Sequence, residues 1–367
     1  MSVRRRRPLT DELASVARRL KQIEASVALL DRVRPLNLRH ELERLSRGFE
    51  AGERLEPAFN YAKPGALGEL RRELSDLTRN LDGANTEARL LTERAAELEL
   101  EAALGEHVGE PEFARLAARR FPLPDDVVAA AKLADQFLAS PGAATGPASA
   151  GPLHDSGDAR DPRSLWSELS RRLEAERWPV RIELVVGLVS LAAVADGVVR
   201  VRAGAALSAR EARRIALHEV EGHVRPRVLG QRLGGVFAAG SARVSLDEEG
   251  RAIWLEEQAG LLEPERRQEL ARRYLAAASV RSGADFWDTV ALLGQRGATL
   301  RAAVELAGRV HRGGGLGREL IYLMGYQRVT VALGRRPELE RVLASGRVGL
   351  TAAEALLLDS IELDGDH

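Results

Sequence analysis

The sequence predicts a mainly α-helical protein with a small β element, an α+β fold class. Apolar residues recur at helical spacing over residues 9–50, 66–104 and 111–139, and again through most of the chain after Ser208. Only two short runs in the sequence are rich in β-branched residues. With 367 residues the chain can bury a large core, in one extended domain or in two smaller ones.

A change of composition divides the chain into three predicted parts. Residues 1–138 are expected to form an N-terminal helical region. Residues 139–163 are small, rich in Pro, Gly and Ala, and almost free of bulky apolar side chains. Such a composition is typical of a flexible loop or linker. Residues 164–367 then form a compact region that carries the candidate chemistry.

Two segments of this last region are predicted to pair as β-strands. Val180–Val186 and Val198–Val201 are rich in β-branched residues, and Ala195-Asp196-Gly197 before the second is a turn signal. The remainder after Ser208 is predicted to be helical. Its helices are expected to break at glycines, which lie within 230–240, at 283, at 297 and within 313–317.

Charge and composition exclude several classes of protein. Lys plus Arg and Asp plus Glu both number 54, so no excess charge indicates a nucleic-acid or membrane-surface partner. Without cysteine there is neither a disulfide framework nor a thiolate metal site, which leaves His and carboxylate as metal ligands. The longest apolar run, Leu184–Ala195, is too short to span a membrane. No apolar stretch follows the basic Arg4–Arg7, so we expect no signal peptide and a cytoplasmic location.

The most informative segment is His218-Glu219-Val220-Glu221-Gly222-His223. Two neutral imidazoles and a later carboxylate can hold a catalytic zinc ion and leave one coordination position open, and Glu219 would be the general base on the reacting water. The two histidines are five residues apart, which on an ideal helix separates them by about 140°. They can reach one metal if the helix contains a π-bulge, for which Gly222 is a plausible position. The alternative is that this spacing signals no metal.

The neighbouring residues favour a site held between two helices. Ser208-Ala209-Arg210-Glu211 is a capping box that starts the helix carrying His218. Ser245-Leu246-Asp247-Glu248 is predicted to be a second capping box, opening a helix with the acidic pair Glu256-Glu257. That pair could supply the third ligand. Ligands on rigid helices keep their geometry.

These residues together resemble the tyrosine carboxypeptidase family that includes the microtubule-associated tyrosine carboxypeptidases. The bacterial members of that family carry a Gln-Glu-Gly-Leu-Ala motif after the histidines. Further segments are similar to family signatures in the same order along the chain, over roughly residues 30 to 335. They are Pro35-Leu36-Asn37, Pro57-Ala58-Phe59-Asn60-Tyr61, His311-Arg312-Gly313-Gly314-Gly315 and Arg318-Glu319-Leu320-Ile321-Tyr322-Leu323-Met324-Gly325.

The resemblance implies a helical, zincin-like metallopeptidase region and one Zn²⁺ per chain. It implies His218 and His223 as zinc ligands and Glu219 as the general base. Aligning Glu256-Glu257 on the Gln-Glu pair of the motif makes Glu257 the third ligand, with Glu256 as the fallback. It also implies cleavage of a C-terminal aromatic residue, Tyr or Phe, from a peptide or protein.

The chain departs from the family pattern at two places. The family usually has Gly-Thr where Glu221-Gly222 stand, and this alignment places Gln258-Ala259-Gly260 where Gly-Leu-Ala is expected. These changes concern substrate preference more than zinc. Dipeptidyl peptidase III shares the five-apart histidines and a downstream Glu-Glu. Another zinc peptidase, of that type or an endopeptidase, therefore stays an alternative, as does a catalytically silent helical scaffold.

Substrate residues are expected around the late glycine run. Arg312 and the backbone of Gly313 and Gly314 could hold the terminal carboxylate of a peptide, because a planar guanidinium suits bidentate contact. Tyr322 could donate a hydrogen bond to the oxyanion of the tetrahedral intermediate. Core packing is the ordinary explanation for an aromatic residue there, and a helix C-cap for His311. The resulting prediction is a zinc-dependent carboxypeptidase.

Overall fold

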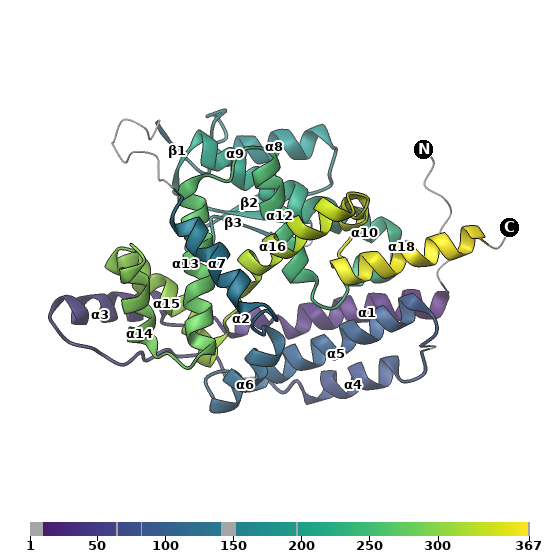
Figure 1. Cartoon of the computed structure of the whole chain (residues 1–367), viewed down its shortest axis with the longest axis horizontal. Coiled ribbons are helices and arrows are strands. Elements are labelled where there is room, and N and C mark those ends of the chain that lie inside the picture. Colours follow the sequence, from purple (N-terminus) through teal and green to yellow (C-terminus); the bar gives the residue numbers. More distant parts are fainter. Residues whose placement is uncertain (1–9, 64, 82, 141–151, 196, 366–367) are drawn as a thin grey trace. The chain divides into compact units, whose positions relative to one another are not determined.

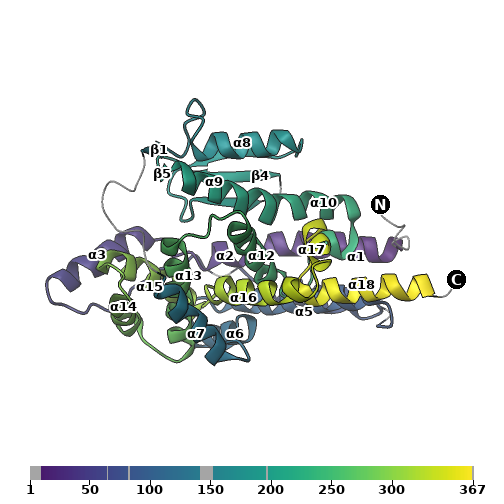
Figure 2. The same cartoon turned by 45° about the horizontal axis from the view of Figure 1, so that its top comes forward.

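The computed structural model describes residues 10–63, 65–81, 83–140, 152–195 and 197–365. Their contacts divide them into two compact units, which are treated separately (Figures 1 and 2). Unit 1 comprises residues 1–17, 141–266 and 325–367, and unit 2 comprises residues 18–140 and 267–324. Both units are discontinuous in sequence. The predicted boundaries of the three parts, at residues 138 and 163, therefore remain a prediction.

Unit 2 is built from helices in the part that the structure describes. They are most of α1 (Asp11–Val27), α2 (Leu29–Arg32), α3 (Leu38–Glu50), α4 (Gly68–Thr78), α5 (Thr86–Glu106), α6 (Pro111–Arg120), α7 (Val127–Leu138), most of α13 (Pro264–Arg281), α14 (Phe286–Gln295), α15 (Leu300–Gly315) and the start of α16 (Leu320–Arg335). Asn85 caps α5 by accepting the N–H of Ala88. The helix then packs along α4 and buries leucines such as Leu91 and Leu98. Burial of this apolar face is the main force holding the helices together.

Unit 1 contains all the described strands and a second set of helices. Its elements are β1 (Leu153–Asp155), α8 (Leu165–Ala175), β2 (Arg181–Val185), β3 (Ala192–Ala195), β4 (Val198–Arg202), β5 (Ala206–Ser208), α9 (Ala209–Leu217), the π-helical turn η1 (His218–Val224), α10 (Arg225–Leu233), α11 (Gly235–Ala239), α12 (Val244–Gln258), most of α16, α17 (Leu339–Ser345) and α18 (Leu350–Gly365).

The strands form two small sheets. In the larger one the order is β2-β4-β3, with β4 parallel to β2 and antiparallel to β3. In the smaller one β1 pairs with β5 in antiparallel fashion. The predicted strands over 180–186 and 198–201 therefore do pair, although in parallel, because the turn signal at 195–197 joins β4 to the additional strand β3. Asp196 lies outside the described residues.

The core of unit 1 lies between the sheet and the helix that carries the His-Glu motif. Leu165 and Leu169 of α8, Val199 of β4 and Val220 of η1 are all fully buried in one apolar cluster. Figure 2 shows α8, α9 and β4 side by side. The apolar side of the motif helix is thereby fixed against the sheet, which anchors the turn that bears the histidines.

The predicted fold class, mainly α-helical with a small β element, is confirmed. Residues 141–151 of the predicted linker lie outside the described residues, and Leu153–Asp155 of its remainder form strand β1. No described helix is both long enough and apolar enough to cross a membrane.

Candidate metal centre

The two histidines lie on a π-helical turn. Ser208 caps α9 through the predicted capping box, with its side chain accepting from Glu211 N–H and the Glu211 carboxylate accepting from Ser208 N–H. The helix then widens into η1, where the N–H of Arg225 donates to the carbonyl of Val220, five residues back. A five-residue turn brings His218 and His223 to the same side, and their Nε2 atoms are 3.3 Å apart. The predicted π-bulge is confirmed.

Gly222 has a different role from the one expected. Its backbone is not in the left-handed region, so the turn does not depend on unusual glycine dihedrals. A Cβ atom at Gly222 would instead lie 2.6 Å from the Cβ of Ala252 on α12. A glycine is therefore required because η1 and α12 approach each other closely at this point.

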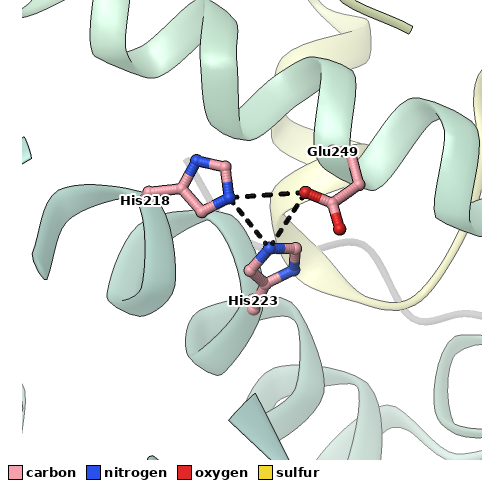
Figure 3. Close-up of side chains that lie close together, drawn as sticks. All are labelled: His218, His223 and Glu249. Atoms are coloured by element: carbon pink, nitrogen blue, oxygen red, sulfur yellow. Dashed lines mark hydrogen bonds and ion pairs between the residues drawn. The ribbon is translucent and has the colours of Figure 1, made fainter. Parts of the chain in front are cut away.

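The carboxylate that meets both imidazoles belongs to Glu249 on α12 (Figure 3). Its Oε2 lies 3.4 Å from His218 Nε2 and 3.7 Å from His223 Nε2. All three residues are buried, each about 8% exposed. For zinc bonds of 2.0–2.1 Å, the ligand atoms of a tetrahedral site are about 3.4 Å apart. Separations of 3.3, 3.4 and 3.7 Å therefore fit a single zinc ion with one position left open.

Glu256 holds the outer nitrogen of His218. The His218 Nδ1–H donates to Glu256 Oε1 at 2.7 Å, which fixes the tautomer and turns Nε2 toward Glu249. Glu256 is fully buried, and the guanidinium groups of Arg214 and Arg266 lie 3.4 and 3.3 Å from its carboxylate. Burial by itself would raise the pKa of Glu256, but Arg266, His218 and Arg214 outweigh it and lower the pKa to about 2. The carboxylate is thus charged and can only accept hydrogen bonds.

Glu248 occupies the corresponding place beside His223. Its Oε1 lies 3.2 Å from His223 Nδ1 and 3.3 Å from Nη1 of Arg227. Although burial would raise the pKa of Glu248, Arg227 and His223 lower it to about 2. Each imidazole therefore has an ionised carboxylate at its outer nitrogen. Arg214 and Arg266 pair with Glu256, and Arg227 pairs with Glu248.

The electrostatics of the two imidazoles indicate a cation site. Burial lowers the pKa of His218, but hydrogen bonding to Glu249 and Glu256 more than compensates and raises it overall. Burial acts in the same direction on His223, and Glu248 and Glu249 raise its pKa well above the ordinary value. The surroundings thus stabilise positive charge at the point where Nε2, Nε2 and Oε2 converge. A divalent cation could bind the lone pairs of the same two nitrogen atoms and the same carboxylate oxygen.

Glu219 differs from the neighbouring acids. It is buried, with about 8% of its surface exposed. Unlike Glu248 and Glu256, it makes no hydrogen bond or ion pair within the part of the chain that the structure describes. Its carboxylate follows His218 directly on η1.

The structure brings Glu249, not the expected Glu257, to the histidines. Glu257 accepts a hydrogen bond from Tyr326 Oη at 2.7 Å, and the fallback Glu256 contacts the outer nitrogen of His218. Adjacent helical residues point about 100° apart, whereas residues seven apart share a face. Glu249 and Glu256 therefore both face η1, and Glu257 does not.

A segment eight residues before Glu256 matches the family motif more closely. Glu248-Glu249-Gly250-Arg251-Ala252 shares Glu, Gly and Ala with the Gln-Glu-Gly-Leu-Ala motif, whereas Glu256-Glu257-Gln258-Ala259-Gly260 shares one Glu. Each of these three shared residues makes a specific contact in the structure. Glu249 meets the histidines, Gly250 allows backbone contact with Gly325 of α16, and Ala252 packs on Gly222. The family motif therefore corresponds to Glu248–Ala252 in this chain.

The second predicted capping box is wrong. Helix α12 begins at Val244 after Arg243, which has a positive φ of 58° and gives no side-chain cap. The Oγ of Ser245 is buried inside the first turn without a hydrogen-bond partner among the described residues. Asp247 instead accepts from the N–H of Leu350 and from Arg328. The acidic residues that suggested a helix cap serve tertiary contacts.

The residues expected to bind substrate lie in unit 2. Tyr322 is buried, and its Oη accepts from Nη1 of Arg318 at 2.9 Å. The Nε of Arg312 is buried without a hydrogen-bond partner in the described part of the chain, and burial lowers the pKa of this guanidinium to about 10. Gly313 and Gly314 both have positive φ, at 71° and 106°. His311 is a packing residue, with Nε2 2.9 Å from Thr289 Oγ1.

The upstream segments of the resemblance are also placed within unit 2. Asn37 Nδ2 donates to the carbonyl of Ala58 at 2.8 Å, and Asn37 Oδ1 accepts from Asn60 N–H at 2.9 Å. Tyr61 Oη accepts the N–H of Gly313 at 2.7 Å. These segments, far apart in sequence, therefore form one contact network around the glycine run.

Comparison with known proteins agrees with the geometry. A family model described as microtubule-associated tyrosine carboxypeptidase matches residues 46–359, which include the π-turn and Glu249. No curated protein and no solved structure matches the chain. The match extends over most of the sequence, and the buried His-His-Glu group lies within it. The chain therefore belongs to the microtubule-associated tyrosine carboxypeptidase family, a zincin-like family of metallocarboxypeptidases.

Proposed function

We propose that this protein is a zinc-dependent carboxypeptidase that removes a C-terminal residue, preferably Tyr or Phe, from a peptide or protein. The observation that carries the proposal is the convergence of His218 Nε2, His223 Nε2 and Glu249 Oε2, at separations that suit one zinc ion. His218, His223 and Glu249 would hold this ion. When bound, zinc supplies Lewis-acid chemistry that makes water a nucleophile near neutral pH and polarises the scissile carbonyl.

Glu219 is the proposed general base. It takes a proton from the attacking water and later delivers it to the amine of the departing residue. Its burial and its place on η1 directly after His218 support this role. Glu248 and Glu256 keep the imidazoles oriented while this proton moves.

Tyr322 and Arg312 are proposed for the substrate. Since the Tyr322 hydroxyl accepts from Arg318, its own proton is free to be donated to an oxyanion. Arg312, whose Nε has no partner within the described residues, is proposed to bind the terminal carboxylate together with the N–H groups near Gly313 and Gly314. The preference for Tyr or Phe is taken from the family.

The experiment compares wild type with Glu219→Gln. Zinc is measured by elemental analysis, and both proteins are incubated with peptides ending in Tyr, Phe or Ala and with a C-terminally amidated Tyr peptide. We expect one zinc per chain in both proteins, release of Tyr or Phe by wild type alone, and no cleavage of the amide. Cleavage of the amidated peptide would indicate an endopeptidase or dipeptidyl peptidase. Zinc without any cleavage would indicate a silent scaffold.

A further inference from the structure

The π-turn leaves the backbone carbonyl of Glu221 without its π-helical donor. In a π-helix each carbonyl accepts from the N–H five residues later. The carbonyl of Val220 does so from Arg225. The next carbonyl, that of Glu221, would need the N–H of residue 226, which is Pro226 and has none. The α-helical donor four residues on, Arg225, is already engaged by Val220.

The missing donor comes from another helix. Nη1 of Arg251 on α12 donates to the Glu221 carbonyl at 2.7 Å, and Nη2 of the same guanidinium donates to Glu340 Oε1 of α17 at 2.8 Å. Arg251 is buried, with about 3% of its surface exposed. Main-chain carbonyls withdrawn from water are almost always paired. This part-buried bond therefore gives the Glu221 carbonyl the donor that the proline lacks.

Arg251 also connects the two elements that carry the metal ligands. It lies two residues after Glu249, and its neighbour Ala252 is the residue that packs on Gly222. Its acceptor, Glu221, lies between His218 and His223 on η1. The side chain therefore ties the turn with two ligands to the helix with the third. At this position the family motif has Leu, which cannot donate a hydrogen bond.

We propose that Arg251 is a positioning residue of the metal centre: it gives the Glu221 carbonyl the hydrogen bond that Pro226 cannot, and thereby holds the π-turn in which His218 and His223 face one metal. This inference rests on the proposed zinc site. Arg251 itself contacts neither metal nor substrate.

A double-mutant cycle tests the proposal. The four proteins are wild type, Arg251→Met, Pro226→Ala and the double variant, and zinc affinity is measured by competition with a chromophoric chelator. Met keeps the apolar stem and removes the donor, and Ala at 226 restores a backbone N–H. We expect Arg251→Met to weaken zinc binding by about 10- to 100-fold. The same change should cost at least about tenfold less in the Pro226→Ala background.

A matched control and a second readout make the result decisive. Arg225→Met removes the arginine that pairs with the Glu221 side chain, 3.1 Å away, and should change zinc affinity by less than about threefold. Equal losses from Arg251→Met in both backgrounds, or no loss in either, would overturn the proposal. The same cycle is run on thermal unfolding of the zinc-free proteins. If wild type binds no zinc, the proposed function fails, while coupling in unfolding still reports on the Arg251 hydrogen bond.

Discussion

Glu256 accepts a hydrogen bond from Nδ1 of His218 at 2.7 Å, seven residues after Glu249 on the same helix. Two helical turns separate the two acids, so both face η1. One carboxylate lies at the inner nitrogen of His218 and the other at its outer nitrogen. The orientation of this imidazole is thus set from both sides by α12.

Removing Glu256 should weaken zinc binding without removing a ligand. In Glu256→Ala the Nδ1–H of His218 loses its acceptor, and Arg214 and Arg266 lose their buried counter-charge. We expect zinc affinity to fall about 10- to 100-fold, as measured by chelator competition. Glu263→Ala serves as the control, because Glu263 is a half-exposed carboxylate paired with Arg210. Affinity equal to wild type in Glu256→Ala would show that packing alone orients His218.

The choice between Glu249 and Glu257 as third ligand can be decided directly. Glu249→Gln should reduce zinc affinity by about a hundredfold or more, because it removes the one charged ligand of the three. Glu257→Gln should retain one zinc per chain, since Glu257 contacts Tyr326. Elemental analysis after dialysis against a weak chelator measures both. Zinc lost from Glu257→Gln and kept in Glu249→Gln would restore the original sequence assignment.

These two acids show what the sequence could and could not predict. The spacing of His218 and His223 required a π-bulge, and the capping box at Ser208 located the helix, so the metal turn was predictable from local rules. The third ligand depended on which face of α12 meets η1. Glu248-Glu249 and Glu256-Glu257 both lie on that helix. Which of these residues face η1 depends on how the helix is rotated about its axis, and the predicted cap at Ser245 does not fix that rotation because the helix begins at Val244.

The contact between Gly222 and Ala252 predicts a pair of compensating substitutions. Gly222→Ala places a Cβ 2.6 Å from the Ala252 Cβ and should lower the free energy of unfolding by roughly 1–3 kcal/mol. Adding Ala252→Gly removes that clash and should recover part of the loss. Urea unfolding of the metal-free proteins measures both effects.

A glycine with open space provides the control for this pair. Gly334 lies on α16, and a Cβ there would meet no atom within 4 Å. Gly334→Ala should therefore be neutral or stabilise by up to about 1 kcal/mol. If Gly222→Ala is as harmless as Gly334→Ala, then η1 and α12 do not approach as closely as described.

His311 predicts an acid-sensitive component of stability in unit 2. Burial lowers the pKa of this imidazole to about 4, from 6.5 in the unfolded chain. Between these values the unfolded state binds the proton and the folded state does not, so stability falls as pH drops from about 6.5 to about 4. The difference corresponds to roughly 3 kcal/mol.

A comparison of pH profiles isolates the contribution of His311. His311→Gln keeps a group that can hydrogen-bond Thr289 and cannot titrate. Its unfolding free energy should decline less between pH 6.5 and 4 than that of wild type. His107→Gln is the control, because His107 lies at the surface beside Glu110. Parallel curves for wild type and His311→Gln would contradict the prediction.

The glycine run of unit 2 combines a locally determined backbone with a long-range contact. The sequence predicts a helix break within residues 313–317, and the positive φ values at Gly313 and Gly314 agree with it. No local sequence pattern predicts that the N–H of Gly313 donates a hydrogen bond to Tyr61 Oη, 252 positions earlier in the chain. Such a contact arises from tertiary packing of segments whose local patterns are independent.

Arg312 provides the test of carboxylate recognition. Its guanidinium is largely desolvated, which lowers its pKa to about 10, and its Nε has no partner among the described residues. An arginine in such surroundings gains most from an anionic ligand. In Arg312→Met we expect KM for a peptide with a free C-terminus to rise about 10- to 100-fold, with a smaller change in kcat. This rise is the equivalent of a charged hydrogen bond of about 1.5–3 kcal/mol.

Zinc content should stay at the wild-type level because Arg312 is not part of the His-His-Glu group. Arg301→Met is the matched control, since Arg301 is exposed and pairs with Glu305 one turn along α15. A fall in kcat at constant KM would assign Arg312 to the chemical step instead, and a loss of zinc would indicate that the variant perturbs the fold.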